Sequence, residues 1–101
     1  MKDIKQFIIE GKAPEKISTT GKKKLTKYID DLIKHVDDIF DYAGIPTDDA
    51  DQVDSDCRDT VWNWADDNNI CSMWSKDDDT VRFVTDEYER LAQAIYDKFN
   101  L

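Results

Sequence analysis

Apolar side chains recur every three to four residues from Lys22 to Ala43, and this pattern constrains the fold more than any other feature of the sequence. The apolar positions are Leu25, Tyr28, Ile29, Leu32, Ile33, Val36, Ile39, Phe40 and Ala43. Such spacing is typical of a helix that buries one wide face. Gly44 and Pro46 follow directly and are expected to end the helix.

The segments on either side predict further elements. A short amphipathic helix is expected over residues 3–10, followed by a linker over residues 12–21 that is rich in turn-forming residues. After the long helix, Thr47 is expected to cap another helix that runs to about Asp67.

Two short runs of apolar and β-branched residues, at 70–74 and 80–84, flank a polar turn at 76–79. This arrangement predicts an antiparallel β-hairpin over about 70–84. Thr85 is expected to cap a last helix, whose apolar face comprises Tyr88, Leu91, Ala92, Ile95 and Phe99. The predicted fold class is therefore α+β and mostly α-helical, with three helices, the hairpin and a C-terminal helix.

The chain length of 101 residues suits one hydrophobic core. We expect a single domain over residues 1–101, in which residues 1–21 form a Lys-rich helix and linker arm. The longest apolar run, at residues 7–9, is too short to span a membrane or to form the apolar part of a signal peptide. Without a secretory signal, Cys57 and Cys71 are expected to be reduced thiols, and the protein to be cytoplasmic.

Charge is divided unevenly along the sequence. Eight lysines lie in the first 27 residues, whereas the chain from Tyr28 onward carries six basic and twenty acidic residues, nearly all of them Asp. Asp is a weaker helix former than Glu, so helix propensity does not account for this choice. The helix expected over 22–43 also opposes its own dipole, because lysines occupy its start and Asp37, Asp38 and Asp41 occupy its end.

The carboxylates of this helix form an acidic ridge opposite its apolar stripe, at Asp30, Asp31, Asp37, Asp38 and Asp41. Lys27 and Lys34 share that sector and are expected to pair with Asp30, Asp31 and Asp38, which leaves only the C-terminal half purely acidic. The ridge continues on the next helix, at Asp48, Asp49, Asp51, Asp54, Asp56, Asp59, Asp66 and Asp67. A solvated face that keeps the protein in solution explains these charges as well as a binding function does.

Rows of carboxylates on rigid helices can imitate the phosphates of duplex nucleic acid. In size, acidity and exposed aromatic residues, the chain from about Asp30 to Asp79 resembles small Asp-rich proteins encoded by phages, including DNA-mimic inhibitors of restriction, CRISPR and DNA-repair enzymes. The opening ten residues also resemble the starts of short phage reading frames. The resemblance implies an anti-defence inhibitor that acts in the host cytoplasm.

The sequence contains no catalytic motif, so neither an enzyme activity nor a cofactor is expected. His35, the only histidine, is expected to pack at the border of the acidic and apolar faces, since no motif places a nucleophile beside it. Asp54, Asp56 and Asp59 could offer oxygen ligands to a cation, as could residues 77–79, but neither set matches an EF-hand loop. No metal site is predicted, and adventitious cation binding at either set stays open.

The three tryptophans are expected to have different roles. Trp64 lies on the apolar face of its helix and is expected in the core. Trp62 either packs inside the fold or forms an exposed aromatic anchor rimmed by carboxylates, a composition typical of interface hot spots. Trp74 is compatible with either environment.

The favoured interpretation is an acidic inhibitor that occupies the nucleic-acid groove of a host or defence protein and binds neither nucleic acid nor membrane itself. Its expected partner-binding residues are Asp37, Asp38, Asp41, Asp51, Asp54, Asp59, Trp62 and Asp66. One alternative is a non-inhibitory helical interaction module or homodimer that associates through an apolar patch at Trp62 or Trp74. A further alternative is nucleic-acid binding through the lysines of residues 2–27, and a metal-dependent enzyme is the least favoured.

Overall fold

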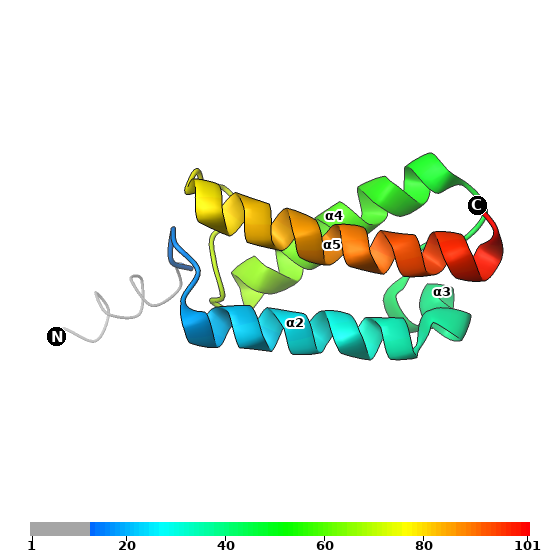
Figure 1. The fold of residues 1–101 in the computed structure, drawn as a ribbon, viewed down its shortest axis with the longest axis horizontal. Helices are drawn as coiled ribbons and strands as arrows, with labels where there is room; N and C mark the ends of the chain where they lie inside the picture. Colours follow the sequence, from blue (N-terminus) through cyan, green and yellow to red (C-terminus); the bar gives the residue numbers. More distant parts are fainter. Residues whose placement is uncertain (1–12) are drawn as a thin grey trace, which may run out of the picture.

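The structure, a computed structural model, describes residues 13–101, and no strand occurs in this part of the chain. The helix expected over residues 3–10 lies outside the described residues. Within this range, four α-helices and a short 3-10 helix follow one another: α2 (Thr19–Lys34), η1 (Val36–Asp38), α3 (Ile39–Ala43), α4 (Ala50–Asp67) and α5 (Asp78–Phe99). Figure 1 shows α2 and α5 running in the same direction, α4 running back, and α3 at the end where the C-terminus lies.

The core lies where α5 packs against both α4 and α2. The buried apolar side chains of α5 are Val84, Leu91, Ala92 and Ile95. Those of α2 are Leu25, Ile29 and Leu32, and those of α4 are Val53, Cys57, Val61 and Ala65. Burying one large aliphatic side chain contributes roughly 1.5–3 kcal/mol, so this packing outweighs the small terms at the helix ends.

The β-hairpin expected over about 70–84 is wrong, because this segment is a loop followed by the first two turns of α5. Asp77 caps the helix, and its side chain accepts the backbone N–H of Thr80 at 3.0 Å. Asp78 and Asp79, expected in a turn, lie in the first turn of α5, where the helix dipole favours negative charge.

The β-branched residues at 80–84 favoured a strand locally, but burial decides their conformation. Thr80 and Val84 are buried one helical turn apart and extend the face of Leu91 and Ile95. The intrinsic penalty for a β-branched residue in a helix is at most about 0.7 kcal/mol, less than the gain from burying one such side chain. Thr85 consequently lies inside the helix, and the expectation that it caps the helix is wrong.

The single helix expected over 22–43 is interrupted at His35, whose φ of -103° and ψ of 24° depart from helical values. Beyond the interruption, Asp37 and Asp38 lie in the first turn of η1, and Asp38 is also the N-cap residue of α3. The helix end expected at Gly44 is confirmed, and this glycine has the left-handed φ of 74° that a C-cap requires.

Two N-caps differ from the expected ones. α2 begins at Thr19, within the expected linker, and the Ser18 hydroxyl accepts the backbone N–H of Gly21 at 2.9 Å. The helix expected to run to Asp67 is confirmed, but Asp49 rather than Thr47 caps it. Both side chains are N-cap residues of the preferred type, short enough to reach a free backbone N–H in the first turn.

The segment before α2 is tied to the start of α5 through Thr80. The Thr80 hydroxyl accepts the backbone N–H of buried Ile17 at 2.9 Å and donates to Asp77 Oδ2 at 2.8 Å. Hydrogen bonds from Thr80 lower the pKa of Asp77, so the carboxylate is ionised at neutral pH and is a strong acceptor. One threonine therefore joins two parts of the chain that are 63 residues apart.

Replacing Thr80 with Val is expected to lower the free energy of unfolding by about 1–3 kcal/mol, because the isosteric side chain leaves a buried N–H group without its acceptor. Urea denaturation followed by far-UV circular dichroism measures the change. Thr85→Val, at a half-buried position on the same helix, is the control and should change stability by less than about 0.5 kcal/mol. Equal destabilisation by the two substitutions would contradict the role given to Thr80.

Candidate functional site

The structure gathers carboxylates from two segments at one end of the helical bundle. The exposed residues concerned lie in η1, in α3 and around the start of α4, and we call them the acidic end: Asp37, Asp38, Asp41, Asp48, Asp49 and Asp51. Figure 1 shows α3, the start of α4 and the C-terminus at this same end. Four of the eight predicted partner-binding residues therefore lie at one end of the bundle.

The last turns of α5 join the two segments of the acidic end. Lys98 Nζ lies 2.7 Å from Asp37 Oδ1, and this hydrogen bond raises the pKa of Lys98. The Tyr96 hydroxyl donates to the backbone carbonyl of Ala50 at 3.3 Å, next to the start of α4. Asp37 stays 68% exposed, so its ion pair contributes little stability and its carboxylate remains accessible.

An exposed aromatic side chain lies within the acidic end. Phe40 is 60% exposed on α3, whereas its neighbour Ile39 is fully buried. The sequence pattern placed Phe40 in the buried stripe, which is wrong because the interruption at His35 turns α3 relative to α2. Phe40 is therefore a candidate site residue that periodicity missed, although its position between Asp38 and Asp41 was visible in the sequence.

Asp31, another residue of the predicted acidic ridge, takes part in the contacts between α2 and α3. The Tyr42 hydroxyl donates to Asp31 Oδ2, which raises the pKa of Tyr42, and the Tyr42 ring stacks on His35 with centroids 4.1 Å apart. His35 Nδ1 lies 2.9 Å from the carbonyl oxygen of Asp31. His35 thus packs beside Tyr42, and Asp31 serves to hold α3 against α2.

The ion pairs on α2 also differ from the expected ones. Asp30 Oδ1 lies 2.7 Å from Arg90 Nη1, and Arg90 Nη2 lies 2.8 Å from Glu87 Oε1. Within residues 13–101, the expected pairs of Lys27 and Lys34 with the ridge do not form. Packing of α5 against α2 supplies the partner instead, which spacing within one helix could not reveal.

The other predicted site residues follow one another along α4, from Asp54, one turn after Asp51, to the end of the helix. Exposed Asp54 is near its start, and Asp59 Oδ1 lies 3.6 Å from Arg58 Nε. Trp62 is half-buried and packs against the core. Asp66 Oδ2 accepts the backbone N–H of Met73 at 3.1 Å and so holds the loop after α4. At 1.5 Å per residue, Asp66 lies about 22 Å along the helix from Asp51.

In residues 13–101, the surroundings of a side chain decide whether it can bind a metal ion or react as a nucleophile. Within residues 13–101, no group of three His, Cys, Asp or Glu side chains is arranged to hold a metal ion. Burial and the nearby carboxylates raise the pKa of Cys57 to about 12, and burial and Asp66 raise the pKa of Cys71 to about 11. Both thiols are therefore neutral at pH 7, and the thiolate is the reactive form.

Native protein is expected to resist modification by a thiol reagent such as Ellman's reagent at pH 8, because both cysteines are buried and protonated. After unfolding in urea, both should react at the rate of a free thiol. Rapid modification of the folded protein would contradict the burial of Cys57 and Cys71.

Comparison with protein-family models, curated proteins and solved structures finds no match to this chain. None of the helices within residues 13–101 has the length and apolar character needed to cross a membrane. Any functional proposal therefore depends on the surface chemistry of the chain itself.

Proposed function

We propose that the protein is a small inhibitor whose acidic end binds a nucleic-acid-binding or nucleic-acid-processing protein of a host or its defence system. The observation that carries the proposal is an exposed Phe40 flanked in the sequence by the exposed carboxylates of Asp37, Asp38 and Asp41. The fitting partner surface is a basic groove that otherwise holds phosphates. In this proposal the protein neither binds nucleic acid itself nor acts as an enzyme.

The distribution of charge supports a directed approach to such a groove. The chain carries a net charge of -9, and the acidic end lies at the opposite end of α2 from Lys22, Lys23 and Lys24. At that other end lysines and carboxylates are mixed, since Asp77 lies near Lys16 and Lys22, so a basic surface is attracted mainly to the acidic end. Charge complementarity of this kind raises association rates and fixes orientation more than it adds affinity.

The exposure of Phe40 favours a binding surface over a surface that serves only solubility. Carboxylates alone keep a protein in solution, and an exposed aromatic ring works against that purpose. Aromatic residues are enriched at the centres of interfaces, where a polar rim surrounds them. Phe40 with Asp37, Asp38 and Asp41 has that composition on a single short segment.

Trp74 favours a second candidate function, a non-inhibitory interaction module or homodimer. Trp74 is 78% exposed in the loop between α4 and α5, and Val81 in the first turn of α5 is also exposed. Association through an apolar patch gains free energy from burial and depends little on salt, unlike association through the acidic end. Trp62 is less available for this role because it packs against the core.

Replacing Asp37, Asp38 and Asp41 together with Asn is expected to weaken partner binding about tenfold, since each rim charge contributes roughly 0.5 kcal/mol. The measurement is affinity capture from a nuclease-treated bacterial lysate at low and high salt, with mass spectrometry to identify the captured proteins. Wild-type protein should capture a nucleic-acid-binding protein at low salt and release it at high salt.

The matched control replaces Asp59, Asp67 and Asp86 with Asn, which changes the net charge equally at exposed positions outside the acidic end. Equal loss of capture in the two triple variants would contradict the proposal. Salt-insensitive capture that Trp74→Ala abolishes would favour the interaction module instead.

A further inference from the structure

A cavity of about 390 Å³ lies between α2 and α4. Both helices pack closely on α5, and neither packs closely on the other. The lining comes from Lys24, Lys27 and Tyr28 of α2, Trp64 of α4, and Asn68 and Ile70 just after α4. This volume falls within the range of roughly 300–1,000 Å³ that is usual for small-molecule sites.

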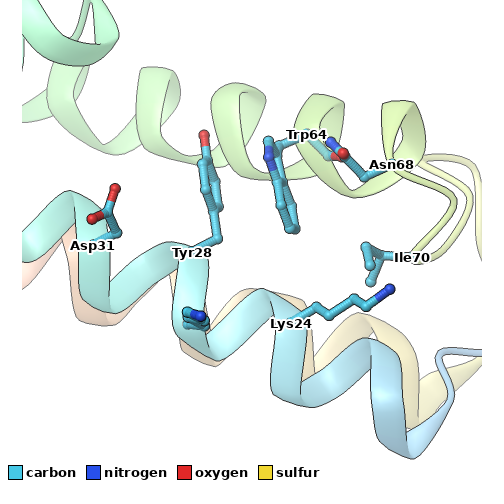
Figure 2. Close-up of a pocket in the computed structure, with 7 residues that line it drawn as sticks. Lys24, Tyr28, Asp31, Trp64, Asn68 and Ile70 are labelled. Carbon is cyan, nitrogen blue, oxygen red and sulfur yellow. The ribbon is translucent and has the colours of Figure 1, made fainter.

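A pair of parallel aromatic rings bridges the two helices at this cavity. The centroids of Tyr28 and Trp64 are 4.1 Å apart and their planes differ by 4°. Figure 2 shows Tyr28 on one side of Trp64, with Asn68, Ile70 and Lys24 on the other side. One face of the indole is therefore covered by Tyr28, and the opposite face borders the cavity and can stack against a further ring.

The polar groups that line this cavity favour an anion. Lys24 and Lys27 are exposed, one helical turn apart, and within residues 13–101 no ion pair involves either ammonium group. The carboxylate at this cavity, Asp31, already accepts the hydroxyl of Tyr42. Burial raises the pKa of Tyr28, so its phenol is neutral and adds no negative charge.

We propose that this cavity binds a small planar aromatic anion, a single ring system carrying one phosphate or carboxylate, of the size of a nucleoside monophosphate. The ring stacks on the free face of Trp64, and the anionic group lies against Lys24 and Lys27. Stacked aromatic pairs contribute about 0.5–1.5 kcal/mol beyond the area that they bury, and the ammonium groups supply the charge complement.

The charge of the whole chain favours a small ligand over a nucleic-acid strand. A long polyanion would meet the field of a protein with a net charge of -9 along most of its length. A ligand with one anionic group responds mainly to charges within about 8 Å at physiological salt, where Lys24 and Lys27 dominate. This site is separate from the acidic end and does not depend on the proposed inhibitor function.

The test titrates full-length ¹⁵N-labelled protein separately with AMP, UMP and indole-3-acetate. NMR spectra record the indole N–H and backbone amide signals at each step. At least one of these probes should shift the signals of Trp64, Asn68 and Ile70 saturably, and highly exposed Trp74 serves as the internal control. Adenosine lacks the anionic group and inorganic phosphate lacks the aromatic ring. Each should therefore bind at least tenfold more weakly than the best probe.

The double substitution Lys24→Gln with Lys27→Gln should weaken binding at least tenfold. Its matched control is Lys22→Gln with Lys23→Gln, which removes the same charge from lysines beside Phe83 in a neighbouring cavity between α2 and α5. The proposal is overturned if no probe gives a saturable shift, if Trp74 shifts as much as Trp64, or if the two double variants bind equally. Tighter binding of a single-stranded oligonucleotide than of any small probe would also overturn it.

Discussion

The burial of one stripe of α5 between α4 and α2 is the constraint on which the rest of the structure depends. α5 is long enough, at about 33 Å for its 22 residues, to reach both ends of the bundle. At its start, Thr80 holds the segment before α2, and at its end Lys98 and Tyr96 join η1 to the beginning of α4. Because α2 and α4 pack on α5 and not closely on each other, a cavity remains between them, and the stacked rings of Tyr28 and Trp64 bridge it.

The many Asp residues of the chain have several distinct roles. Asp49 and Asp77 cap helices, which the short side chain of Asp does better than that of Glu and which explains part of the preference for Asp. Other carboxylates hold elements together, namely Asp30 through Arg90, Asp31 through Tyr42 and Asp66 through the loop after α4. Acidity is therefore partly structural, and the carboxylates around Phe40 are the ones for which a binding role is proposed.

Periodicity in the sequence located α2, α4 and the second half of α5, and it identified the buried residues Leu25, Ile29 and Leu32 of α2 and Leu91, Ala92 and Ile95 of α5. It failed where tertiary packing opposes a local preference, at the β-branched residues 80–84 and at the interruption at His35. The exposure of Asp37, Asp38, Asp41 and Asp51 could be predicted from the helical wheel. The outward position of Phe40 and the stacking of Tyr28 on Trp64 could not, since they depend on how separate helices are oriented on α5.

The most direct test of the central claim, that the acidic end around Phe40 is a binding surface, is site-specific photo-crosslinking. A photoreactive phenylalanine analogue replaces Phe40 in one sample and exposed Gln93 of α5 in another, and each is irradiated in a nuclease-treated bacterial lysate. The account predicts a crosslink from position 40 to a nucleic-acid-binding protein, which added duplex DNA removes, and no such crosslink from position 93. Identical crosslinks from both positions, or crosslinks from position 40 that DNA leaves unchanged, would contradict it.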